Sequence, residues 1–106
     1  MEKQIGYLKG HTIVCCYGRN GQKAILKLGN YNKKFVVVDK KKEMIETLDA
    51  QNILNIEGDA TLDETLHKAG IEKASFLITA LPSDADNLFV VLTASQLNKD
   101  CIIISR

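Results

Sequence analysis

Four short stretches of this 106-residue chain could do chemistry, and each of them follows an apolar run. They are residues 17–21, 39–40, 59–61 and 80–81. Apolar runs rich in β-branched residues are typical of parallel strands that are covered on both faces. Because ligands bind beyond the carboxyl ends of such strands, we expect the four stretches to form one binding site.

The first stretch has the composition of a phosphate-binding turn, and its residues are Tyr17, Gly18, Arg19, Asn20 and Gly21. Gly18 would let the backbone approach a pyrophosphate, and Gly21 would let the next helix pack close to its strand. Free N–H groups at the start of that helix, together with Arg19, would favour the phosphate charge. The motif Gly-x-Gly-x-x-Gly lacks its first glycine, since Cys16 stands there. The two remaining glycines also fit an ordinary turn between a strand and a helix.

Asp39, which lies outside the glycine motif, supports the interpretation of that motif as a nucleotide-binding turn. It lies 18 residues after Gly21 (39 − 21), close to the spacing of about 20 at which an acid binds a ribose hydroxyl. A carboxylate at this place would repel a 2′-phosphate, so NAD or an adenine nucleotide is favoured over NADP. The lysines at 40–42 fit a solvated charged corner, with Lys40 alone as a candidate to flank the adenine.

The remaining candidates follow the third and fourth apolar runs, and they are Asp59, Ala60, Thr61, Ala80 and Leu81. Asp59 and Thr61 also have a structural interpretation, because Thr61 with Glu64 has the spacing of a helix capping box. For Thr61 we expect capping to be the main role.

Other chemistries find little support. His11 and His67 have no carboxylate, serine or second histidine at a useful spacing, so we expect both at the surface. Asp84 and Asp86 resemble a carboxylate pair, but the start of a helix explains them without a metal. The three cysteines lack metal-ligand spacing and are expected to be buried reduced thiols. The sequence therefore predicts no catalytic residue and no metal site.

The elements that position these residues alternate along the chain. Apolar runs predict strands at about 12–16, 35–38, 53–56, 76–79 and 101–104, and an amphipathic helix is expected between each pair of neighbours. Ser83 is a plausible cap of the last helix, over 84–97. This order favours an α/β fold, a doubly wound parallel sheet in a Rossmann-type three-layer sandwich.

The helix over 84–97 carries more apolar residues than one narrow stripe can hold. Such breadth indicates burial on more than one side. One side would cover the sheet, while the other would meet either a second subunit or flanking helices of the same chain.

Composition limits the class of protein to which this chain can belong. The chain is 45% hydrophobic and 25% charged, with one proline and a formal net charge of +1, which fits one folded domain and gives no global field for nucleic acid. No apolar run reaches the ~20 residues that span a bilayer, so we expect a soluble chain that does not insert into a membrane. Residues 1–10 are expected to be a lead-in segment, and 11–106 the folded domain.

With these stretches assembled, the chain resembles the N-terminal Rossmann subdomain of the RCK/KTN (TrkA-N type) family, which regulates potassium conductance. The similarity rests on residues 10–21, 36–39, 58–61, 69–71 and 80–94, of which the last stretch is the most specific to the family. The resemblance implies a cytoplasmic regulatory domain at the inner face of the membrane, and not an enzyme. Its ligand would be NAD(H) or ATP, ADP or AMP.

The resemblance further implies self-association into a dimer or a higher ring, and a pore-forming potassium channel or transporter subunit as partner. It implies that the helix from Asp84 serves assembly. Two features depart from the family. Cys16 replaces the usual glycine and would crowd the turn, and the chain ends before the sixth strand of the subdomain. Two alternatives therefore stay open: the cofactor half of an NAD-dependent oxidoreductase, and a domain that only assembles and has lost its nucleotide.

Overall fold

The computed structural model describes residues 8–15, 23 and 34–105. Five strands lie in this part of the chain: β1 (Thr12–Cys15), β2 (Phe35–Asp39), β3 (Asn55–Glu57), β4 (Phe76–Thr79) and β5 (Ile102–Ser105). The described helices are α3 (Lys42–Ala50), α4 (Asp63–Lys68), the single 3-10 turn η1 (Ile71–Lys73) and α5 (Asp84–Leu97). None of the described helices combines the length and the apolarity needed to cross a bilayer.

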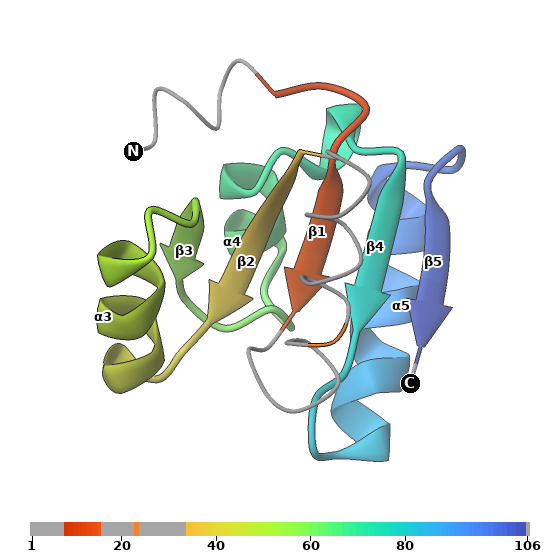
Figure 1. Cartoon of the computed structure of the whole chain (residues 1–106). Coiled ribbons are helices and arrows are strands. Elements are labelled where there is room, and N and C mark those ends of the chain that lie inside the picture. Colours follow the sequence, from red (N-terminus) through yellow and green to blue (C-terminus); the bar gives the residue numbers. More distant parts are fainter. Residues whose placement is uncertain (1–7, 16–22, 24–33, 106) are drawn as a thin grey trace.

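The strands form one parallel sheet in the order β3-β2-β1-β4-β5. All five arrows in Figure 1 therefore point to the same edge, where the carboxyl ends of the strands meet. The chain moves outward from β1 to β3 and then returns past β1 to β4, which places the reversal of strand order between β1 and β4. Ligand sites of open α/β sheets lie outside such a reversal.

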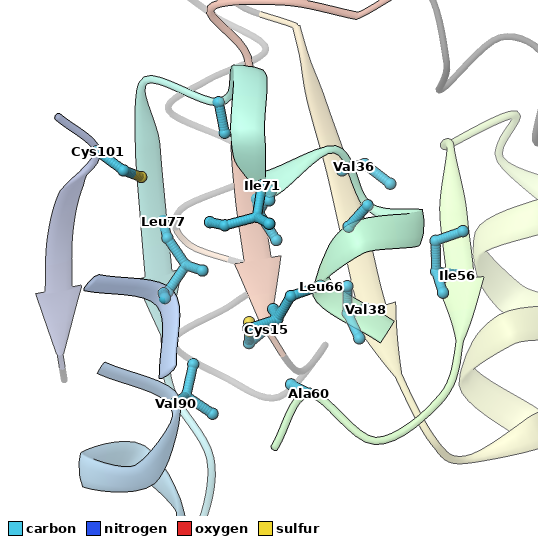
Figure 2. Packing of buried hydrophobic residues seen from close by; sticks show 14 of the residues in the cluster. Cys15, Val36, Val38, Ile56, Ala60, Leu66, Ile71, Leu77, Val90 and Cys101 are labelled. Atoms are coloured by element: carbon cyan, nitrogen blue, oxygen red, sulfur yellow. The ribbon is translucent and has the colours of Figure 1, made fainter. Parts of the chain in front are cut away.

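Helices cover both faces of the sheet, which makes three layers (Figure 1). On one face, Val14 and Val37 pack against Ile45 and Leu48 of α3. On the other face, alternate strand residues pack against α4 and α5 in the larger core cluster, which includes Cys15, Val38, Leu66, Leu77 and Val90 (Figure 2). The predicted α/β fold with a doubly wound parallel sheet is confirmed.

The predicted boundaries are met closely in the second half of the chain. The strand over 76–79 and the helix over 84–97 agree with β4 and α5, whereas β3 begins two residues later and β5 one residue later than expected. The predicted helix after the first strand lies outside the described residues.

Residue 11 departs from the sequence prediction. His11 was expected at the surface but is buried, with 1% of its area exposed. Its Nε2 lies 2.8 Å from the carbonyl oxygen of Ala69 and donates to it, because a carbonyl can only accept, so Nε2 carries a proton. Nδ1 is buried without a hydrogen-bond partner in the part of the chain that the structure describes. The prediction failed because a histidine just before a strand gives no sign of the α4 carbonyl that meets it.

Gly70 completes this contact at the amino edge of the sheet. Its φ of 79° is in the left-handed region, and a Cβ there would lie 3.0 Å from the His11 ring. The glycine therefore ends the turn after α4 and lets the imidazole approach the backbone.

The predicted capping box is also wrong. The N-cap of α4 is Leu62, which makes no side-chain cap hydrogen bond. The Thr61 hydroxyl instead donates to Asp59 Oδ1 at 2.7 Å. Asp59 thereby captures the hydroxyl in a local turn before the helix begins.

Two groups of apolar side chains stay exposed. On α5, Leu88, Phe89 and Leu92 are 60%, 55% and 57% exposed, whereas Val90 and Ala94 are fully buried against the sheet. No described residue covers the outer side of α5. At the sheet edge, Ile102 of β5 and its β4 neighbour Phe76 are 56% and 40% exposed.

Candidate functional site

A pocket with a volume of about 280 Å³ opens at the carboxyl edge of the sheet. Three segments build it: the end of β2 with the start of α3, the loop after β3, and the connection from β4 to α5. Its lining residues are Val38, Asp39, Lys40, Lys41, Gly58, Asp59, Ala60, Leu81, Pro82, Ser83 and Asp86. The volume is near the lower end of the ~300–1,000 Å³ range of ligand pockets, which suits a ligand part of nucleoside size.

Asp39 ends β2 and is held by the backbone that follows it. The residue is 6% exposed, and its Oδ1 accepts a hydrogen bond from the N–H of Lys41 at 2.9 Å. The carbonyl of Asp39 also accepts from the N–H of Gly58 at 3.0 Å, which joins the ends of β2 and β3. The carboxylate is therefore fixed in place before any ligand arrives.

The loop after β3 holds the second carboxylate. Asp59 Oδ1 accepts from both the N–H and the hydroxyl of Thr61, at 2.9 and 2.7 Å. These two hydrogen bonds lower the pKa of Asp59, first the one from the Thr61 hydroxyl, and the charge of Lys40 lowers it further. Gly58 allows this turn to lie close to α4, since a Cβ would lie 3.0 Å from two atoms of Thr65.

The third wall is fixed by Asn87, in the first turns of α5. Its Oδ1 accepts from the Thr79 hydroxyl at 2.6 Å and from the Leu81 N–H at 2.9 Å, and its Nδ2 donates to the Leu81 carbonyl at 2.9 Å. Asn87 is 4% exposed and Thr79 is fully buried. A single amide side chain thus fixes the connection from β4 to α5 that lines the pocket.

The start of α5 contributes hydroxyl and carboxylate groups to the same wall. Ser83 is the N-cap, as predicted, and its Oγ accepts from the Asp86 N–H at 3.3 Å. Asp84 and Asp86 lie in the first turn, where the helix dipole favours negative charge. These carboxylates already compensate the positive end of the α5 dipole, so a phosphate group would bind more favourably elsewhere.

The polar groups of the pocket define what it can hold. Asp39, Asp59 and Asp86 contribute three carboxylates, against the two ammonium groups of Lys40 and Lys41. Carboxylates accept hydrogen bonds from hydroxyls and amino groups, which are the donors of a ribose and an adenine. The apolar lining residues offer surfaces for a flat base, and they are Val38, Ala60, Leu81 and Pro82. The described part of the pocket thus suits a sugar and a base better than an anion.

Of the seven predicted site residues that the structure describes, five come together around the pocket. Asp39, Lys40, Asp59, Ala60 and Leu81 line the pocket. Thr61 and Ala80 lie behind the lining: Thr61 supports Asp59, and the N–H of Ala80 bonds the carbonyl of Cys15 at 3.3 Å.

The predicted phosphate-binding turn, with Tyr17, Gly18, Arg19, Asn20 and Gly21, lies outside the described residues. β1 ends at Cys15, between β2 and β4. The phosphate-binding role of residues 17–21 therefore remains a prediction.

Sequence reasoning missed several lining residues, notably Lys41, Pro82, Ser83 and Asp86. For Ser83 and Asp86 a signal was present, because a helix start after a strand of a parallel sheet lies at the carboxyl edge. The capping interpretation explained both residues and so hid their position on the pocket wall.

Among the residues that the structure describes, no three histidine, cysteine, aspartate or glutamate side chains gather as metal ligands. His67 is exposed, as predicted, but its Nδ1 does contact a carboxylate, that of Glu72. This partner was not predicted, because residue 72 is brought back beside α4 only by the η1 turn. Cys15 and Cys101 are buried, as expected, and burial raises the pKa of the Cys101 thiol.

A parallel sheet in this order, with its pocket at the carboxyl edge beside the reversal, defines a Rossmann-type domain. The family model of the TrkA-N domain matches residues 12–106, and the chain belongs to this family. Potassium channel protein 1 of Methanocaldococcus jannaschii is 39% identical over 108 residues, which cover 100% of this chain and 32% of that protein. The chain thus spans about a third of this channel relative.

Solved structures show the same fold. The TrkA-N domain of the inner membrane protein ybaL from Escherichia coli superposes with a TM-score of 0.90 and 26% identity, covering 94% of this chain and 74% of that one. The GsuK channel bound to NAD superposes with a TM-score of 0.83 and 27% identity, covering 93% of this chain and 18% of that one. A further GsuK structure is bound to ADP.

Proposed function

We propose that this chain is a nucleotide-binding regulatory domain of a potassium channel or potassium transporter. The observation that carries the proposal is the pocket at the carboxyl edge, in which the carboxylates of Asp39 and Asp59 face an apolar lining. The membership in the TrkA-N family and the GsuK structures with NAD and ADP support it. The expected ligand is NAD(H) or ATP, ADP or AMP.

Different residues of the site bind different parts of the nucleotide. Asp39 accepts hydrogen bonds from the ribose hydroxyls, and its charge disfavours a 2′-phosphate. The base lies between the apolar residues, with Asp59 and Lys40 at its rim. The phosphates lie toward the segment after β1, where the predicted turn of Gly18 to Gly21 supplies N–H groups. The acidic start of α5 is the wrong place for them.

The test is isothermal titration calorimetry of the chain with NAD⁺, NADH, ATP, ADP and AMP. At least one is expected to bind one to one, and NADP⁺ is expected to bind at least tenfold more weakly than NAD⁺. A chain that is folded by circular dichroism yet binds none of the five would contradict the proposal.

We propose further that the chain self-associates through α5. The exposed side chains of Leu88, Phe89 and Leu92 form one patch, because they are spaced by three and four residues on the helix. Large apolar side chains exposed together mark an interaction site more often than an isolated one does. The family resemblance assigns assembly to this helix, so a second copy is the expected partner.

The change Leu92→Asp tests this surface. It places a charge in the centre of the patch and is expected to weaken dimerisation at least a hundredfold, as measured by sedimentation velocity. Glu46→Gln on exposed α3 serves as the control and is expected to leave the dimer unchanged. A parent chain that stays monomeric at millimolar concentration would contradict the assembly proposal.

In the full-length protein, nucleotide binding would then bias the arrangement of associated domains and thereby the ion flux through a pore-forming subunit. We place the domain at the cytoplasmic face of the membrane and assign it regulation without catalysis. Whole-cell recording of the full-length protein with and without the bound nucleotide checks this assignment. A nucleotide that binds the domain but leaves potassium flux unchanged would contradict it.

A further inference from the structure

We propose that Asn87 is a positioning residue that links occupancy of the pocket to the apolar patch on α5. The inference rests on the proposed nucleotide binding and self-association, and it names the connection between them. The proposed function has nucleotide binding bias the associated domains without saying which residue transmits that bias, and the inference assigns this role to Asn87.

The first step is the set of hydrogen bonds at the start of α5. Asn87 holds both backbone groups of Leu81, its N–H and its carbonyl, each at 2.9 Å. Leu81 lines the pocket, whereas Asn87 itself does not. Any displacement of Leu81 by a ligand therefore acts on Asn87, because moving one without the other breaks two partly buried hydrogen bonds.

The second step is the rigidity of the helix that carries Asn87. α5 is 14 residues long, or about 20 Å at 1.5 Å per residue, and Ser83 caps its first turn. The far end is held by another asparagine: Asn98 Nδ2 donates to the carbonyls of Ile71 and Ala74 at 2.8 and 3.0 Å. A push at Leu81 therefore tilts α5 about its anchored end near Asn98.

The third step is the position of the apolar patch along α5. Leu88 follows Asn87 directly, and Phe89 and Leu92 lie within the next turn and a half. Leu88 and Phe89 lie in the half of α5 nearer to the pocket, and Leu92 lies just past its middle, so a tilt about Asn98 moves Leu88 and Phe89 the most. The buried residues Val90 and Ala94 on the opposite side allow a tilt but not a rotation, since rotation would expose them.

The consequence is a measurable coupling. If ADP changes the dimer dissociation constant by some factor, dimerisation must change the affinity for ADP by the same factor. We expect a factor of at least fivefold in the parent chain, within the range of about 5 to 150 that is common for linked sites. The probe is ADP, or NAD⁺ if calorimetry shows it to bind more tightly.

The experiment measures the dimer dissociation constant by sedimentation velocity, with and without saturating ADP, in the parent and three variants. Asn87→Ala is expected to reduce the coupling factor to below twofold while dimerisation without ADP stays within threefold of the parent. Asn98→Ala is the matched control, since it removes from the other end of α5 an amide that also makes three hydrogen bonds of 3.0 Å or less, to Ile71, Ala74 and Asp100. It is expected to keep most of the coupling, although it lowers the melting temperature as well.

Thr79→Val removes one of the three bonds of Asn87 and keeps the volume of the side chain. Its coupling factor is expected to lie between those of Asn87→Ala and the parent. If Asn87→Ala abolishes ADP binding, this variant decides: a reduced factor supports the inference, and the parental factor overturns it.

The outcomes separate the inference from the proposed function. A parent that binds ADP and dimerises with no coupling overturns the role of Asn87 but leaves nucleotide binding and self-association standing. A coupling that survives Asn87→Ala, or that Asn98→Ala removes equally, overturns it too. A parent that binds neither ADP nor NAD⁺ removes the proposed function itself.

Discussion

The two edges of the sheet use their polar residues differently. At the amino edge, His11, Gly70 and Asn98 meet the backbone of the same chain: the imidazole bonds Ala69, and the amide bonds Ile71 and Ala74. At the carboxyl edge, Asp39, Asp59 and Asp86 surround a pocket of about 280 Å³. The difference teaches that polar residues near a strand end serve stability where they bond only the chain, whereas those that bond the chain and also line a pocket can serve binding.

The largest expected effect is at the amino edge, from Gly70→Ala. The φ of 79° strains any residue with a Cβ, and the added methyl lies 3.0 Å from the His11 ring. We expect a loss of about 2–3 kcal/mol in the free energy of unfolding, measured by urea denaturation. Nucleotide affinity of the folded fraction should remain that of the parent. An affinity that falls together with stability would contradict the separation of the two edges.

The next effect is at the carboxyl edge, from Asp39→Asn. The amide keeps an acceptor for the Lys41 N–H but loses the charge that accepts strongly from a ribose. We expect nucleotide affinity to fall by about 2 kcal/mol, or roughly thirtyfold, in calorimetry. Asp49→Asn is the matched control, because Asp49 bonds Asn55 outside the pocket. An equal loss of affinity in the control would remove Asp39 from the site.

A smaller effect at neutral pH, but one that grows in acid, comes from His11. Burial lowers the pKa of this imidazole from its ordinary value of 6.5, against the opposing effect of its hydrogen bond to Ala69. The unfolded chain therefore binds a proton that the folded chain does not, so stability is complete above about pH 6.5 and is lost as the pH falls toward the folded pKa. The slope should reach at most about 1.4 kcal/mol per pH unit.

His11→Gln checks this interpretation, since its amide can donate to Ala69 without titrating. We expect the variant to lose that part of the slope of unfolding free energy between pH 6.5 and 5, measured by urea denaturation at each pH. His67→Gln is the control for a titratable ring at the surface. A slope that persists unchanged in His11→Gln would place the proton uptake elsewhere.

The smallest effect is expected from the surface pair of His67 and Glu72, whose side chains are 45% and 62% exposed. His67→Ala should change the free energy of unfolding by less than about 0.5 kcal/mol, because exposed ion pairs contribute little. Thermal denaturation in low and high salt measures this difference. A loss above about 1 kcal/mol would show that contact with the backbone is not what distinguishes the stabilising polar residues at the amino edge.

The same contrast explains what the sequence could and could not predict. Strand alternation and the spacing of Asp39 are local signals, so the sheet, its topology and the convergence of Asp39, Asp59 and Leu81 followed from them. His11 was misplaced because its partner, Ala69, is 58 residues away. Thr61 was misassigned because α4 has its N-cap at Leu62, one residue later than expected, and the Thr61 hydroxyl donates to Asp59 instead. No sequence pattern predicted the role of Asn87, since its reciprocal hydrogen bonds to Leu81 depend on how the connection from β4 to α5 folds.

The exposed edge strand β5 has a consequence for handling the chain in solution. Ile102 and Phe76 lie side by side and exposed, and β5 is the outermost strand of the sheet that the described residues form. Such edges template strand addition by other copies, which leads to slow, concentration-dependent precipitation. A lysine in place of Ile102 would oppose this addition by charge repulsion while the interior of the fold stays intact.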